Sequence, residues 1–459
     1  MNPLDRKSVL TKRESAPSNT PFYLVLFYLL LEFGRPQDIV PGLGVLSLPM
    51  LTIIGIGILL FSAGKVSFGD KQTKLLLALL ALMVLHGPIA VNNFHALMTF
   101  KAMALTFVGF LGIIRFVDSV QKLKTLATVW LGVHAALAVL GMIKGGQGVG
   151  GWMGDENDFC MQLNMVVSFA YFGYFAAPNA FQRWTCLGLL CTYVSTIILT
   201  LSRGGFIGLL SVGLYCWLLS SRKVLSAALI VLLVGFMFLV APSEYWTEIE
   251  SIGDDKTMDT GTGGERMYTW EVGWDMFLAN PIIGVGQGNF QWVFDEYEAG
   301  RTFHGKSIAG RVAHSAYFTL LPELGLVGTF LFVGILVFTR KDLGLIYKSY
   351  RAACDRGDMS SEQYDSLKTT YFLGRAMEAS IIGYLVSSIF IATLYYPSLW
   401  IMIAFVIALR NVVVKIDSAA TPGHLTEPIL SSGSYRGSVL SPRRSINVQQ
   451  AIEVQQRPS

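Results

Sequence analysis

The chain has 459 residues, of which 53% are hydrophobic and only 14% are charged. Soluble domains carry about 25% charged residues, so this composition excludes an ordinary soluble globular protein. The formal net charge of +4 is small for this length. We therefore expect no nucleic-acid partner, and the position of each charge is more informative than their sum.

Apolar runs of about 20 residues recur along the chain, and each is long enough to cross a hydrocarbon core of ~30 Å as a helix. The runs are continuous and do not alternate, so they indicate helices and not barrel strands. The sequence predicts an all-α polytopic integral membrane protein. Its twelve predicted spans lie near residues 21–34, 47–64, 75–91, 97–117, 124–143, 157–177, 184–201, 204–220, 224–241, 314–338, 371–395 and 397–414.

The basic residues are distributed unequally between the two sides of these spans. With the N-terminus inside, 26 of the 35 Lys and Arg residues fall on the cytoplasmic side. This positive-inside bias predicts that both termini are cytoplasmic. The resulting regions are a cytoplasmic tail (1–20), nine spans (21–241), a periplasmic loop (242–313), three spans with a cytoplasmic loop near 340–370 (314–415) and a disordered cytoplasmic tail (416–459).

The cysteines and the N-terminus add little to this organisation. Four of the five cysteines lie within apolar runs and none lies in the long loop, so no disulfide framework is expected. The first apolar run lacks a small-residue cleavage site, and we expect no cleavable signal peptide.

The long loop has helical periodicity of its own. Met267, Trp270, Trp274 and Phe277 recur at the spacing of one helix face, which ends before Asn280-Pro281. This face suits either a helix lying in the lipid interface or an ordinary packing face in a small subdomain. A second helix is expected in NFQWVFDEYEAG.

Arg203 lies in the turn LTLSRGGFIG, between two apolar spans on the outer side. Gly204 and Gly205 allow close backbone approach and are expected to leave amide donors exposed at the next helix start, which is a favourable anion position. The alternative is an arginine that marks a helix end by reaching to the membrane surface.

Arg266 and His314 lie at the two ends of the loop. A neutral imidazole at the membrane edge could accept a proton from a hydroxyl group, and Arg311 would share its helix face if the helix extends back that far. The alternatives without a catalytic role are a surface ion pair of Arg266 with Glu265 or Glu271, and, for His314, an interfacial histidine with no function.

Three further polar patterns have structural explanations that require no bound nucleotide or metal. Glu323, deep in the tenth span, is expected to pair with an arginine or with a backbone donor near Pro322. The glycine-rich stretch GVGQGNF is interpreted as a turn between two loop helices, because no strand precedes it. The acids of GDENDF are interpreted as a helix cap, so no metal site and no cofactor are expected.

These motifs, taken in order, resemble the O-antigen ligase and polymerase superfamily. The resemblance rests on SRGG between two spans, on a loop with NPIIGVGQGNF, and on HSAYFTLLPELGLVG, and it is best over 200–332. Many members have His-Asn where this chain has His314-Ser315.

The resemblance implies an enzyme of the bacterial inner membrane, a glycosyltransferase with its active site facing the periplasm. The implied donor is a glycan on undecaprenyl diphosphate, and the acceptor is a glycan, a lipid A core or a protein. Arg203 and Arg266 would bind the diphosphate, with Arg311 and Arg35 as weaker candidates, and His314 would act as general base. Glu323, Gly204 and Gly205 would support the site. Protein O-oligosaccharyltransferase activity and polysaccharide or small-solute transport remain the alternatives.

Overall fold

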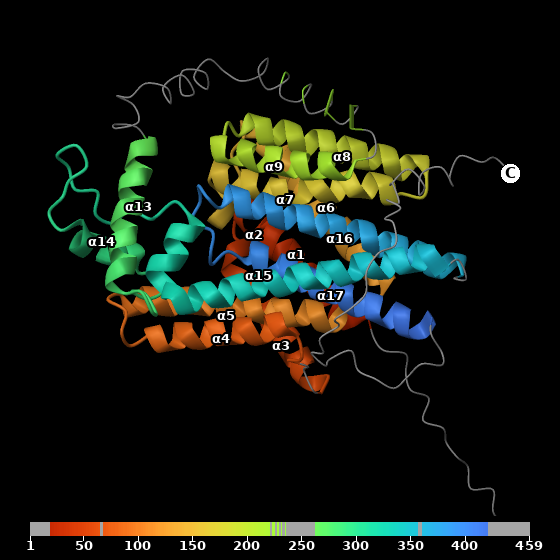
Figure 1. The fold of residues 1–459 in the computed structure, drawn as a ribbon, viewed down its shortest axis with the longest axis horizontal. Coiled ribbons are helices and arrows are strands. Elements are labelled where there is room, and N and C mark those ends of the chain that lie inside the picture. The colour runs from red at the N-terminus through yellow and green to blue at the C-terminus, as the bar shows by residue number, and fades with distance from the viewer. Residues whose placement is uncertain are drawn as a thin grey trace, which may run out of the picture.

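The computed structural model describes residues 19–64, 68–220, 262–356 and 360–420, together with a few isolated residues between 223 and 235. Within this part the chain is helical, and its one extended pairing is an isolated bridge between Phe303 and Lys306. Long helices run side by side in a bundle, and α13 crosses one end of it (Figure 1). We refer to this end as the α13 end.

Eleven of the twelve predicted spans overlap helices of the bundle. These are α1 (Thr20–Gly34), α3 (Leu48–Ser62), α4 (Lys71–His86), α5 (Asn93–Phe116), α6 (Val120–Ile143), α7 (Glu156–Ala176), α8 (Ala180–Leu199), α9 (Arg203–Leu219), α15 (Ala316–Arg356), α16 (Ser361–Ser387) and α17 (Pro397–Ala420). The predicted ninth span, loop residues 242–261 and most of both tails lie outside the described residues.

Six of these helices are long and apolar enough to cross a membrane, among the residues that the structure describes. They are α3 with the preceding 3-10 turn η1 (Leu43–Leu46), α5, α6, α7, α15 and α17, while α1 and α9 are shorter apolar helices. The chain is therefore an all-helical membrane protein, and the count of twelve spans stays a prediction.

The region near 340–370, predicted as a cytoplasmic loop between spans, is largely helical, because α15 continues to Arg356 and α16 begins at Ser361. Its cytoplasmic position stays a prediction. Beyond Arg340 the helix keeps an apolar stripe, whose members Leu343, Ile346 and Tyr350 are buried. This spacing keeps one face of the helix packed against its neighbours, so α15 extends beyond the end of the continuous hydrophobic run. The predicted tail also starts too early, since residues 416–420 belong to α17.

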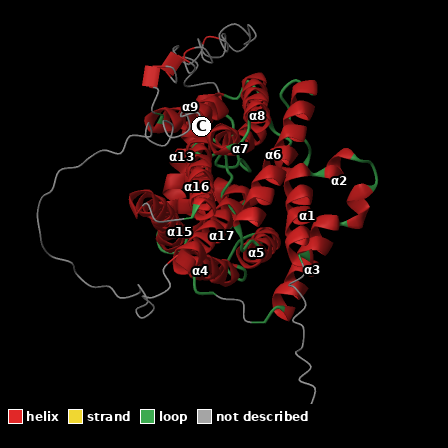
Figure 2. Cartoon of the chain, turned by 90° about the vertical axis from the view of Figure 1, so that its right-hand side faces the viewer, coloured by secondary structure: helices red, strands yellow, loops and turns green. Residues whose placement is uncertain are grey.

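Inside the bundle, α7 packs against α8, α9 and α16, and α17 packs against α5, α15 and α16. Figure 2 views this arrangement from one end, with α16 and α17 near its middle. Small residues allow the closest approaches. A Cβ added at Gly208 of α9 would lie 2.1 Å from the Oγ of Ser387 in α16, so only glycine fits there.

A second, smaller core lies at the α13 end. It joins α13 (Thr262–Ala279), α14 (Phe290–Glu298) and the segment that leads into α15, and its buried members are Val272, Met276, Phe290, Val293, Phe294 and Ala313. The predicted apolar face of α13 is only partly a packing face. Phe277 is 9% exposed, but Met267 and Trp274 are 62% and 47% exposed.

The turn between α13 and α14 is bonded into a break in α15. In an uninterrupted helix, Leu326 N–H would donate to the Pro322 carbonyl and Val327 N–H to the Glu323 carbonyl. Gly325, with φ 60° and ψ −162°, interrupts the helix at this point. All four groups bond to the turn instead: Val285 N to Pro322 O (2.9 Å), Gly286 N to Glu323 O (3.0 Å), Leu326 N to Pro281 O (2.8 Å) and Val327 N to Ile282 O (3.0 Å).

Candidate functional site

His314 lies on the surface at the α13 end, two residues before α15 begins at Ala316. Its backbone is left-handed, with φ 44°, so the chain turns sharply here. The turn is held where Ala316 N donates to Ser388 O at 2.9 Å. The helix does not extend back to 311–314, so the condition for a shared helix face of Arg311 and His314 is not met.

Charged side chains from two other elements surround His314. Loss of hydration lowers its pKa from the ordinary value, and the positive charges of Arg266 and Arg311 lower the pKa further. Glu265 and Asp155 act in the opposite direction. The net effect favours the neutral imidazole near pH 7.

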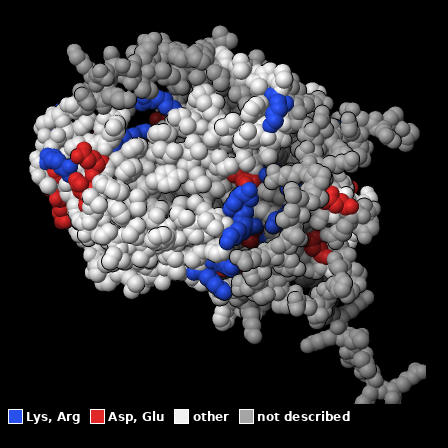
Figure 3. Space-filling model, viewed as in Figure 1, with Lys and Arg blue, Asp and Glu red and all other residues white. Residues whose placement is uncertain are grey.

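Glu265 pairs with Arg311 and not with its neighbour Arg266. The Nε of Arg311 lies 2.7 Å from Glu265 Oε1, and this ion pair joins the start of α13 to the loop before His314. Arg266 is half-buried on the same first turns of α13. Figure 3 shows basic side chains gathered around a hollow between α13 and the nearby ends of α8 and α9.

The turn with Arg203 reaches the same end of the molecule. Ser202 caps α9: its Oγ accepts from Gly205 N (3.0 Å) and donates to Asn157 Oδ1 (2.7 Å), next to the start of α7. Asp155, which acts on the His314 pKa, is the cap of that same helix. Arg203, Arg266, Arg311 and His314 therefore gather at one end of the bundle.

Gly204 and Gly205 serve close packing, and the Gly205 amide is not open. Both are buried, and the Gly205 amide is already bonded to Ser202. A Cβ at Gly205 would lie 2.0 Å from Cys160 Sγ of α7, and one at Gly204 would lie 3.1 Å from the Phe390 side chain. The expected exposed donor at Gly205 is therefore wrong, because the helix cap uses that group.

Glu323 is buried, at 2% exposure, and accepts three hydrogen bonds. Its donors are Gly288 N at 2.6 Å, Phe290 N at 3.0 Å and the Tyr395 hydroxyl at 2.6 Å. The expected pairing with backbone donors is confirmed, although the donors belong to the α13–α14 turn. The interpretation of GVGQGNF as a turn between helices is confirmed as well.

Arg35 lies apart from this cluster. Its guanidinium pairs with Asp38 and packs against Gly151, whose φ of +57° and closeness to the guanidinium leave no room for a Cβ. No described contact joins Arg35 to His314. The acids of GDENDF cap α7 as expected, since Asp155 accepts from Asn157 N at 2.8 Å.

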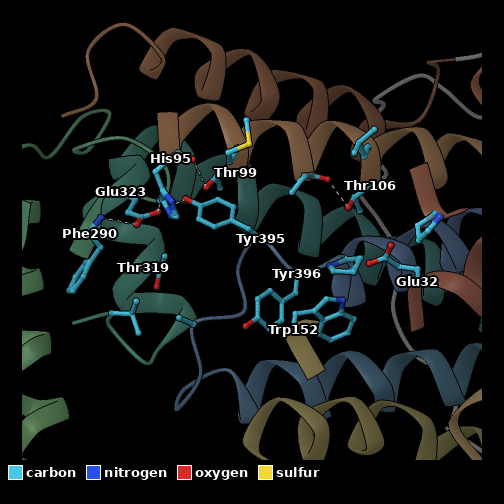
Figure 4. A pocket seen from close by; sticks show the side chains of 18 of the residues that line it. Glu32, His95, Thr99, Thr106, Trp152, Phe290, Thr319, Glu323, Tyr395 and Tyr396 are labelled. Carbon is cyan, nitrogen blue, oxygen red and sulfur yellow. Dashed lines mark hydrogen bonds between the residues drawn. The ribbon is translucent and has the colours of Figure 1, made fainter. Parts of the chain in front are cut away.

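Directly behind the loop that ends in His314 lies a cavity of about 620 Å³. Val312 and Ala313 form part of its wall, and α1, α3, α5 and α15 supply most of the rest. Figure 4 shows Glu323 and Tyr395 toward one end and Glu32, Trp152 and Tyr396 toward the other. The wall is mostly apolar, with its polar groups concentrated at these ends.

Several members of this site were not predicted from the sequence. Asp155 and Glu265 were read as a cap and as a surface acid, and Tyr395 was not singled out. Tyr395 lies 72 residues from Glu323 in the chain, so only the tertiary fold brings the two together.

Residues 187–333 match the family described as O-Antigen ligase. This range holds Arg203, Arg266, Arg311, His314 and Glu323, and it covers α9, α13, α14 and the break in α15. No curated protein matches the chain. The match supports a membrane glycan-transfer function of ligase type, and it supports the resemblance of this part of the chain to the O-antigen ligase superfamily.

Proposed function

We propose that this protein transfers a glycan from undecaprenyl diphosphate to a hydroxyl acceptor on the periplasmic face of the bacterial inner membrane. The observation that carries the proposal is the cluster at the α13 end, where arginines surround a histidine whose pKa is lowered. The family match supplies the coarser part, a lipid-linked glycan donor and a glycan acceptor.

The diphosphate would be held by Arg203 and Arg266. A guanidinium stays charged and offers paired donors that fit phosphate oxygens. Negative charge grows on the diphosphate as its bond to the sugar breaks, so fixed positive charges stabilise the transition state more than the ground state. Arg311, whose Nε lies 2.7 Å from Glu265 Oε1, stays a weaker candidate.

His314 would accept the proton of the acceptor hydroxyl. The hydroxyl oxygen attacks the anomeric carbon, its proton passes to the neutral imidazole, and the bond between the anomeric carbon and the diphosphate oxygen breaks. The bonding electrons leave on that oxygen, beside the arginines. A lowered pKa suits this role, because the imidazole is then unprotonated near neutral pH.

The cavity behind His314 would hold part of the prenyl chain. Its wall is mostly apolar, and most of its polar groups are engaged elsewhere: Thr99 and Thr106 bond to carbonyls of their own helix, and Glu323 is satisfied by Tyr395 and the turn. A mostly apolar wall of this kind can accommodate hydrocarbon.

The test is the glycan profile of a strain that lacks this protein. Bare core with accumulated lipid-linked polymer indicates a ligase, and single-repeat lipopolysaccharide indicates a polymerase. Loss of another surface polysaccharide indicates a growing exopolysaccharide as acceptor, and loss of protein glycans indicates a protein O-oligosaccharyltransferase. An unchanged profile with a defect in solute uptake would overturn the proposal in favour of transport.

A further inference from the structure

A second hollow lies along α13, where Phe318 of α15 forms part of its wall. It is a groove of about 650 Å³ between α13 and the loop residues 302–304. Its wall includes Tyr268, Trp270, Glu271, Trp274, Phe303 and His304. Glu271 and Trp274 come from one face of α13, so the groove follows that helix.

The aromatic rings of this groove are held in place by bonds on their far sides. Trp270 donates from Nε1 to Ala313 O at 2.8 Å and stacks on Phe318 with parallel rings 4.9 Å apart. Tyr268 donates to Glu298 at 2.9 Å and packs against Phe303 at 5.6 Å. These rings therefore need no rearrangement before a ligand binds.

Polar groups stand beside the rings. Glu271 is 66% exposed at its side chain and lies 3.3 Å from Arg301, so its carboxylate remains accessible to a ligand. Thr302 and His304 line the opposite wall. A pyranose ring matches this combination, because its C–H face packs on the negative face of an aromatic ring while its hydroxyls bond to groups at the edge.

We infer that the groove along α13 is a binding subsite for an oligosaccharide chain, a run of pyranose rings lying next to the diphosphate site. This inference rests on the proposed function. Gly264 lines one end of the groove, and the following residues, Glu265 and Arg266, belong to the charged cluster around His314. A glycan attached to a diphosphate there could extend directly onto Trp270 and Trp274.

The competing occupant is the lipid interface, and the local charge argues against it. Glu271 and Asp275 flank the groove and share a single partner, Arg301, at 3.3 Å and 2.6 Å. Two carboxylates around one guanidinium leave excess negative charge, which repels anionic headgroups. The Trp270 N–H is also used inside the protein and is not available to headgroups.

Binding is tested on the full chain in nanodiscs with maltotetraose, chitotetraose and mannotetraose, by saturation-transfer NMR of the sugars. At least one sugar should bind at millimolar concentration, and Trp274→Ala should weaken it about tenfold, as expected for one aromatic contact. Trp274→Phe should keep most of the affinity. Trp292→Ala is the matched control, since Trp292 is 49% exposed, like Trp274 at 47%, but lines neither hollow.

Three results would overturn the inference: no binding by any of the three sugars, equal binding by Trp274→Ala, or quenching of Trp274 fluorescence by brominated lipid, measured as the difference from Trp274→Phe. Transfer assays then separate the source of the chain. A raised KM for the lipid-linked donor assigns the groove to the donor glycan, and a raised KM for the acceptor assigns it to the acceptor. Sugar binding without any transfer would leave the groove in place while rejecting the proposed function.

Discussion

At the scale of single residues, the site depends on how His314 is surrounded. Its imidazole is near two arginines and two acids from three separate segments, and loss of hydration adds to the effect of the arginines. Arg266, which would hold the diphosphate in the proposed mechanism, also lowers the pKa of His314. In that mechanism, one positive charge would both bind the leaving group and favour the neutral base.

The pH dependence of transfer tests this link. We expect kcat/KM to rise with pH through the lowered pKa of His314 and to level off at a lower pH than an ordinary histidine would give, because only the neutral imidazole accepts a proton. Arg311→Gln removes a positive charge, so the pKa should rise and the acid limb should move to higher pH. Lys306→Gln, a change on the same loop that is not among the charges named for the His314 pKa, should leave the pH of the acid limb unchanged. His314→Ala should abolish transfer.

Substitution of Arg203 separates phosphate binding from a helix-end role. Arg203→Lys keeps the charge but loses the paired donors, so transfer should fall by about tenfold or more if the guanidinium holds the diphosphate. The measurement is kcat/KM for the lipid-linked donor at equal protein levels in the membrane. Near-normal turnover would show that Arg203 only marks the start of α9.

At the scale of elements, the break in α15 decides where the α13–α14 unit sits. The four backbone groups of two bonds that an unbroken helix would keep to itself instead make four bonds to the turn between α13 and α14. The Glu323 carboxylate adds two bonds to the same turn. His314 lies just before α15 and Arg266 lies on α13, so this junction sets their separation.

Gly325→Ala should therefore weaken the hydrogen bonds between the break in α15 and the turn between α13 and α14. The Gly325 backbone lies in a region that only glycine adopts readily, and a Cβ there would lie 2.5 Å from Ile282 O. We expect the free energy of unfolding to fall by about 2–4 kcal/mol, measured in detergent. Gly213→Ala in α9 is the matched control, because nothing lies within 4 Å of its added Cβ, and an equal loss there would remove the special role of Gly325.

At the scale of the whole molecule, charged residues gather in two separate regions of the bundle. The α13 end carries the candidate site, whereas the far end of α15 has Arg340 and Arg375 paired with Glu378. Arg410 pairs with Asp70 at that same region. The proposed anion site therefore lies at the α13 end, and the ion pairs of Glu378 and Asp70 lie away from it.

The proposed orientation is tested by cysteine accessibility. Ala309→Cys, on the exposed loop at the α13 end, should react with a membrane-impermeant maleimide at the outer face of the inner membrane in spheroplasts. The native Cys354 is exposed near the far end of α15 and should react only after the membrane is opened. Labelling of Cys354 in sealed spheroplasts would reverse the orientation.

The sequence by itself determined the class of the protein and the approximate positions of eleven helices in the described part. These features depend on composition and on local apolar periodicity, which a single chain displays directly. It also placed Arg203, Arg266 and His314 near the ends of helices. The continuation of α15 past Arg340 was missed, because the length of a hydrophobic run does not show where packing against α16 ends.

Only the tertiary structure decided which of these residues meet. Asp155 acts on His314, Ser202 bonds to Asn157, and Glu323 bonds to Tyr395 across 72 residues of chain. It also showed that the glycines of SRGG pack against α7 and Phe390, and that Arg35 pairs elsewhere. Such contacts join distant segments and depend on how side chains fill the space between helices, which local periodicity does not encode.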